Sequence, residues 1–250
     1  MPDITVLSLN MQGVSGSDIG NAMSTIQPDL VALQEAPKPP HQFYVDITAV
    51  VGALKPYDMT GPIREYPEPP PLIGIQFLDA QGPMKRIVVL YKKATMQLTS
   101  PLTLVNFLND RNIVRPKSVG QARSRGFAAR TPAYCEFTHG TNRIGLFVWH
   151  APTKTDLAHD SAIENFNKCY SLQDAHTNNH LTILAGDFND DRLSGFFSDF
   201  GHGIQHHFDY ILGDRVNRHT DLSSGTHKAL LDQLCTRSQD HFAMGVSLNY

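Results

Sequence analysis

The chain has 250 residues, of which 41% are hydrophobic and 18% charged, and its net charge is −3 at pH 7. This composition excludes an intrinsically disordered chain, and the slightly acidic balance argues against indiscriminate binding to polyanions. No apolar run approaches the roughly 18 residues of a transmembrane helix, and the opening residues MPDITVLSLN lack the basic region of a signal peptide. We therefore expect a single domain over residues 1–250, with no stable membrane insertion and no implied homo-oligomer.

Short apolar or alternating runs, rich in valine, isoleucine and aromatic residues, predict β-strands along the whole chain. In chain order they cover residues 4–10, 30–36, 73–79, 87–93, 133–137, 144–150, 181–188, 209–212 and 244–249. Neighbouring runs such as 73–79 and 87–93 have the spacing of antiparallel hairpins.

Helical spacing of apolar residues predicts three helices between these strands. The sets are Ile19, Ala22, Met23 and Ile26; Ile163, Phe166 and Tyr170; and Leu230, Leu231 and Leu234. Pro28 ends the first helix, and Thr155 or Asp156 is the expected N-cap of the second. Strands outnumber helices, so the pattern favours an α+β fold in which two sheets pack together with helices outside.

Two further features leave alternatives open. Residues 106–130 form a polar stretch with six arginines and lysines, which either binds substrate or keeps a surface loop soluble. The three cysteines, Cys135, Cys169 and Cys235, lie far apart without a C-x-x-C pair, so zinc or redox chemistry is not indicated. Isolated buried thiols and one disulfide are both compatible with this spacing.

Six of the predicted strands have polar side chains at or just beyond one end. These side chains are Asn10, Glu35, His150, Asp187 with Asn189, Asp209, and Asp240 with His241. A single acid at a strand end is ordinarily a solvated turn residue, but turns alone do not explain six ends that carry only Asn, Glu, Asp and His.

The same residue types suit a hard cation and a phosphate. Magnesium prefers oxygen ligands, which Glu35, Asp240 and the amide of Asn10 supply. The two histidines gain or lose a proton near neutral pH, and an aspartate beside a histidine favours the imidazolium. The pattern therefore indicates acid–base chemistry next to a divalent cation.

Six motifs, taken in order, resemble those of the endonuclease/exonuclease/phosphatase (DNase I-like) superfamily. They are LNMQG (9–13), LVALQEA (30–36), FVWHAPT (147–153), LAGDFND (184–190), FDYILG (208–213) and SQDHFAM (238–244). Within that superfamily, NMQG, LQEAPKPP, KRIVVLYKKATMQLTSPLTL (85–104), RTPAY (130–134) and DYILGDRVNR (209–218) look most like the catalytic B subunit of cytolethal distending toxin. The resemblance implies a four-layer sandwich of two mixed sheets flanked by helices.

The resemblance also implies a role for each motif residue. It implies that Glu35 binds the metal and that Asn10 and Asp240 complete or support the metal site. His150 and His241 match the catalytic histidine pair, and Asp209 matches the acid that orients His241. Asp187 and Asn189 match the pair that handles water and phosphate. Arg86 and Arg130 match phosphate-binding arginines, and Glu65 matches a glutamate that supports His150.

By this resemblance the chain is a divalent-metal-dependent DNase of toxin type that uses Mg²⁺, Mn²⁺ or Ca²⁺. The resemblance also implies secretion, delivery into host cells with the binding subunits of an AB-type toxin, and action there on DNA. The alternatives are a phosphatase on the same fold, acting on a phosphoinositide or another monoester, and a non-enzymatic binding module. Leu9 in place of the family's tryptophan, Ala243 in place of its proline, and the acidic net charge depart from the toxin pattern. These departures remove no catalytic residue, but the charge and the 106–129 loop leave the substrate open.

Overall fold

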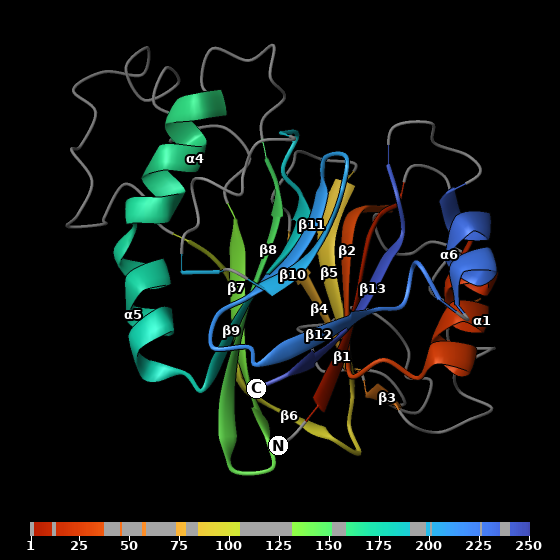
Figure 1. The fold of residues 1–250 in the computed structure, drawn as a ribbon, viewed down its shortest axis with the longest axis horizontal. Helices are drawn as coiled ribbons and strands as arrows, with labels where there is room; N and C mark the ends of the chain where they lie inside the picture. Colours follow the sequence, from red (N-terminus) through yellow and green to blue (C-terminus); the bar gives the residue numbers. More distant parts are fainter. Residues whose placement is uncertain are drawn as a thin grey trace, which may run out of the picture.

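Two mixed β-sheets pack face to face, with helices on both outer faces (Figure 1). The computed structural model describes residues 3–11, 14–37, 46, 57–58, 74–78, 85–105, 132–151, 159–190, 199–200, 202–225, 227–235 and 241–250. This arrangement confirms the predicted four-layer sandwich.

The first sheet joins both ends of the chain. Its order is β12-β13-β1-β2-β5-β3, and β4 also pairs with β5. The strands are β1 (Asp3–Asn10), β2 (Leu30–Pro37), β3 (Tyr57–Asp58), β4 (Gly74–Leu78), β5 (Lys85–Lys92), β12 (Arg218–Asp221) and β13 (Met244–Asn249). In its centre, β1 runs parallel to β2 and antiparallel to β13. The predicted antiparallel pairing of β4 with β5 is confirmed.

The second sheet has the order β10-β11-β9-β8-β7-β6. Its strands are β6 (Met96–Leu104), β7 (Ala133–His139), β8 (Asn142–His150), β9 (Leu181–Asp187), β10 (His202–His206) and β11 (Asp209–Gly213). Only β8 and β9 are parallel neighbours in this order, and β11 runs antiparallel to β9.

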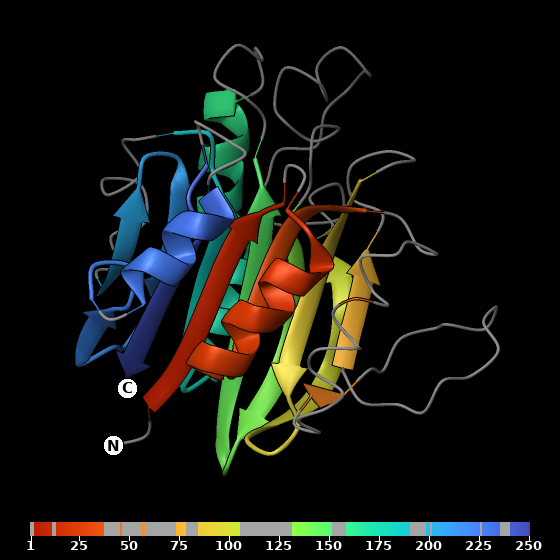
Figure 2. The ribbon, with the colours of Figure 1, turned by 90° about the vertical axis from the view of Figure 1, so that its right-hand side faces the viewer.

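Helices cover the outer face of each sheet. The helices α1 (Gly16–Ile26) and α6 (Lys228–Cys235) lie against the first sheet, as Figure 2 shows, and α4 (His159–Lys168) and α5 (Tyr170–Asn178) lie against the second. The hydroxyl of Ser15 caps α1 by accepting from the amide of Asp18 at 3.2 Å. At the other end Gln27 adopts a left-handed conformation, and α1 stops before Pro28 as predicted. Among the described residues, no helix combines the length and hydrophobicity needed to cross a bilayer.

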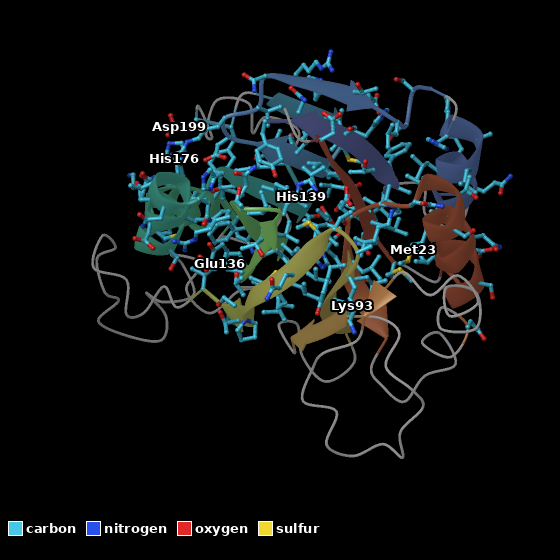
Figure 3. The ribbon with its side chains drawn as sticks, turned by 90° about the horizontal axis from the view of Figure 1, so that it is seen from below. Met23, Lys93, Glu136, His139, His176 and Asp199 are labelled. Carbon is cyan, nitrogen blue, oxygen red and sulfur yellow. The ribbon has the colours of Figure 1, made fainter. Side chains whose placement is uncertain are left out.

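Three clusters of buried side chains hold these layers together. The central cluster lies between the sheets and includes Ile4, Val6, Leu30 and Ala32. A second cluster fills the space between the first sheet and its helices, where Met23 of α1 is fully buried; Figure 3 shows Met23 between α1 and the sheet. The third cluster lies under α4 and α5.

The sequence predicted one helix where the structure has two. Ile163 and Phe166 lie on α4, but Tyr170 begins a separate helix, α5, because Cys169 between them has an extended backbone with φ −67° and ψ 143°. The proposed N-caps, Thr155 and Asp156, lie outside the described residues. Cys135 and Cys169 are buried free thiols, so neither is in a disulfide.

Candidate active site

Strand direction brings the predicted polar side chains to one end of the sandwich. The parallel pairs β1–β2 and β8–β9 end there, and β11 and β13 begin there because they run antiparallel to β9 and β1. Within the second sheet, Asp187 is registered directly with both His150 and Asp209. The opposite end of the sandwich, where Figure 3 labels His139 and His176, carries none of the motif residues that the structure describes.

A β-bulge turns the end of β2 toward the site. The register with β5 shifts between Leu33 and Ala36, and Glu35 in between has a positive φ of 55°. Leu33 and Ala36 both contact the core beneath the helices although they are three residues apart. Regular alternation would place them on opposite faces, so the bulge lets both Gln34 and Glu35 leave the helix side. A strained conformation at such a position is typical of functional sites.

His150 lies between two carboxylates. Its Nδ1 is 3.5 Å from Oε1 of Glu35, and its Nε2 is 3.4 Å from Oδ2 of Asp187. The imidazole is 4% exposed, and Asp187 is fully buried. The ring therefore links the end of β2 in one sheet with the end of β9 in the other.

His241, three residues before the start of β13, approaches the same aspartate. Its Nδ1 is 3.4 Å from Oδ2 of Asp187 and 3.6 Å from Oδ2 of Asp209. The second distance is long for a hydrogen bond but short enough for charge attraction in a buried site. The amide of Phe242 donates to Oδ2 of Asp209 at 3.0 Å and fixes this carboxylate next to the ring.

Two asparagines hold Asp187 in place. Nδ2 of Asn10 donates to Oδ2 of Asp187 at 3.1 Å, and the amide of Asn189 donates to its Oδ1 at 2.9 Å. Asn189 has a positive φ of 52°, and its side chain donates to the carbonyl of Ala151 at 2.9 Å. The bond from the Asn189 side chain to Ala151 ties the end of β9 to the residue that follows His150.

Burial and crowding shift the ionisation of these groups. Burial, and secondly the charge of Asp209, raise the pKa of Asp187 to about 6. Burial also raises the pKa of Asp209. For His241, burial alone lowers the pKa, but Asp209, Asp187 and Glu35 together outweigh it, so the net pKa is raised. The acids thus favour positive charge at this position, whether on an imidazolium or on a bound cation.

The residues present fit a divalent cation in two places. Oδ1 of Asn10 is buried and has no hydrogen-bond partner within the described part of the chain, next to the strand that carries Glu35. Separately, ligand atoms of Asp187, Asp209 and His241 all lie within 4.8 Å of one another. We favour the first place, because a cation at the second would compete with His241 for the carboxylates that flank it.

Gly186 allows the two central strands to meet beside the site. It has a φ of 143°, and a Cβ atom there would lie 1.9 Å from the carbonyl oxygen of Trp149. Asp187 directly follows Gly186, and His150 directly follows Trp149. The close approach of Gly186 to Trp149 therefore sets the separation of Asp187 and His150.

We expect Gly186→Ala to destabilise the protein by about 3 kcal/mol, which combines backbone strain with a forced shift of β8. In thermal unfolding this corresponds to a melting temperature lower by roughly 6–12 °C. The matched control is Gly140→Ala, which also has a positive φ, of 61°, but has open space around the new Cβ. The control should lose only about 1 kcal/mol. Equal losses would show that the approach to Trp149 is not a constraint.

Four of the predicted site residues are not placed in full. Arg130, Asp240 and Glu65 lie outside the described residues. The backbone of Arg86, on β5, is registered with Ala36 of β2, but the side chain of Arg86 is not described. The sequence reasoning passed over Gly186 and Gln34, although each directly precedes a predicted site residue and is therefore signalled by the motif itself.

Solved structures show the same architecture. ANGEL2, a 2′,3′-cyclic phosphatase, aligns with a TM-score of 0.63 and 12% identity over 98% of this chain and 95% of that chain. An endonuclease/exonuclease/phosphatase from Bacteroides vulgatus aligns with a TM-score of 0.61 and 10% identity over 100% and 99%. D. rerio TDP2 complexed with a single-strand DNA product aligns with a TM-score of 0.56 and 12% identity over 100% of both chains.

The chain has the endonuclease/exonuclease/phosphatase (DNase I-like) fold. No protein-family model and no curated protein matches its sequence. The similarity in structure spans the whole chain, and it includes both sheets whose strand ends form the site.

Proposed function

We propose that the protein is a divalent-metal-dependent phosphodiester hydrolase that nicks DNA. The observation that carries this proposal is the buried cluster in which His150 and His241 both approach Oδ2 of Asp187, at 3.4 Å each. Two histidines around one carboxylate, beside an unpartnered amide oxygen, combine acid–base groups with ligands for a hard cation.

Glu35 and Asn10 are the proposed metal ligands, with Asp240 as a further ligand or support. The bound cation would neutralise charge on the phosphate and the leaving oxygen. His241, held by Asp209, and Asp187 are the two candidates to accept the proton of the attacking water. His150, whose Nε2 lies 3.4 Å from the same oxygen of Asp187, is the proposed donor of a hydrogen bond to the phosphate or of a proton to the leaving group.

The proposal also covers the substrate, the residues that contact it and the biological role of the protein. The TDP2 structure with its DNA product supports DNA as the substrate class. Arg86 and Arg130 are proposed to contact phosphate, Asn189 to assist them, and Glu65 to support His150. The toxin-type role, delivery into host cells and AB-type partner subunits rest on the sequence motifs alone.

A phosphatase is the second candidate function. ANGEL2, which has the same fold, is a 2′,3′-cyclic phosphatase, so this fold also carries activity on another phosphate ester. The histidine–aspartate cluster fits either reaction, because both need a charged phosphate bound and a water activated.

Supercoiled plasmid separates the candidates. With Mg²⁺ or Mn²⁺ the protein should convert it to the nicked form, and excess EDTA should abolish the conversion because the cation is removed from its ligands. A phosphoinositide and a 2′,3′-cyclic nucleotide, assayed in parallel, test the phosphatase. Cleavage of these esters with intact plasmid would replace the nuclease proposal, and full nicking in EDTA would contradict the metal requirement.

A further inference from the structure

Two buried amide oxygens on neighbouring strands have no hydrogen-bond partner among the described residues. They are Oδ1 of Asn10, at the end of β1, and Oε1 of Gln34, one residue before Glu35. Asn10 is 1% exposed and Gln34 is fully buried. An unsatisfied buried acceptor loses the hydrogen bonds that it makes with water in the unfolded chain, so each oxygen is expected to face a hydrogen-bond donor or a cation.

The orientation of both amides follows from their partners. Nδ2 of Asn10 donates to the carboxylate of Asp187, and Nε2 of Gln34 donates to the carbonyl of Ala32 at 3.2 Å and to Oγ of Ser8 at 3.3 Å. Carboxylate and carbonyl oxygens only accept hydrogen bonds. A flip of either amide would set two acceptors against each other, so the unpartnered atoms must be the oxygens.

Both oxygens lie on the inner face of the first sheet. Asn10 and Gln34 are directly registered on parallel strands, which are about 4.8 Å apart, and their side chains project from the same face. Ala32, two residues before Gln34, packs into the core between the sheets. Asn10 bonds Asp187 of the second sheet across this same space. The two acceptors therefore lie beneath the strand ends that carry the site.

We propose that Gln34 is a positioning residue of the cation site, where its Oε1 accepts a hydrogen bond from a water bound to the cation held by Asn10 and Glu35. This inference rests on the metal requirement of the proposed function. Magnesium keeps several of its waters in protein sites, and acceptors that orient such waters and ligands contribute strongly to metal affinity. The bond from Gln34 to Ser8 anchors the amide on β1, so Gln34 joins both metal-bearing strands.

The test is Mn²⁺ affinity, measured by calorimetry without substrate, in Gln34→Met and Gln34→Glu. The methionine keeps the volume and removes the acceptor, so the Kd should rise about 10- to 100-fold. The glutamate loses the Nε2 donor to Ala32 and Ser8, as the methionine does, but it retains an acceptor oxygen and adds a negative charge near the cation. It should therefore bind Mn²⁺ more tightly than Gln34→Met. Thr182→Val is the control, because it removes a buried hydrogen bond, to the carbonyl of Ala175, at the far end of β9. Melting temperatures without metal verify that every variant is folded.

A Gln34→Met Kd within about threefold of the wild type would overturn the assignment. Equal weakening in Gln34→Glu and Gln34→Met would show that the affinity depends on what both variants lose, the Nε2 donor and the original packing, and not on the acceptor oxygen, which also overturns the assignment. Wild-type protein that binds Mn²⁺ with the expected Gln34 dependence but cleaves no phosphodiester would contradict the proposed function and support the role of Gln34. Wild-type protein that binds no Mn²⁺ would overturn both.

Discussion

Glu35→Gln should lower the rate of plasmid nicking by at least about 10²-fold, because electrostatic stabilisation by a bound cation is worth several kcal/mol and each 1.36 kcal/mol is tenfold in rate. The change keeps the size of the side chain and removes its charge. It should also weaken Mn²⁺ binding, so the nicking rate of the variant should saturate at a higher metal concentration than that of the wild type.

Glu35 also lies 3.5 Å from His150, so a loss of rate alone would not separate a metal ligand from a partner of the imidazole. The shift in metal dependence separates them, because His150→Ala removes no proposed metal ligand and should raise the saturating concentration much less than Glu35→Gln does. Glu136→Gln is the matched control. Its carboxylate accepts from Tyr134 at 2.7 Å and pairs with Arg143 on β7 and β8, outside the site. An unchanged metal dependence in Glu35→Gln would remove Glu35 from the metal site.

The position of the site residues at one end of the sandwich was predictable, because these residues lie at or next to the ends of strands. Buried strands such as LFVWH and LTILAGD are continuous apolar runs, and parallel neighbours deliver their last residues to one edge of a sheet. His150 and Asp187 lie side by side for this reason. Asp209, at the start of β11, and His241, just before β13, reach the same end of the sandwich because these strands run antiparallel to β9 and β1.

The edge strands were not predictable from periodicity. β12, with the sequence RHTD, is mostly exposed and is held by backbone pairing with β13. β6 contains Pro101 and has register shifts against β7, so its polar and apolar residues do not alternate regularly. The sequence MQLTSPLTL therefore gives no clean period of two, and the strand is visible only through its pairing.

The conformation of Glu35 was also not predictable from the sequence. Alternation along LVALQEA would turn either Gln34 or Glu35 away from the site, and only the bulge with its positive φ lets both leave the helix side. The bulge is set by pairing with β5, about fifty residues away in the chain, so local sequence does not encode it. The roles of Arg86, Arg130, Asp240 and Glu65 stay predictions.

His150→Ala and His241→Ala should each lower the nicking rate by at least about 10²-fold, the low end for positioned acid–base groups. Because both rings contact Oδ2 of Asp187, the double variant should lose much less than the product of the two single losses. Asp209→Asn should reproduce most of the His241→Ala loss. The asparagine can still accept from the amide of Phe242, but it no longer supplies the charge that favours the imidazolium.

The control for the Asp209–His241 pair is a second aspartate–histidine pair far from the site, in which the aspartate is buried and the histidine is partly exposed. Oδ2 of Asp214 lies 2.7 Å from Nδ1 of His176, at the end of the sandwich that Figure 3 faces. Asp214→Asn should therefore leave the nicking rate within about twofold of the wild type even if it lowers the melting temperature. Circular dichroism verifies the fold of each variant. If Asp209→Asn and His241→Ala instead multiply as independent losses, Asp209 does not act through His241, because two members of one catalytic unit are not additive.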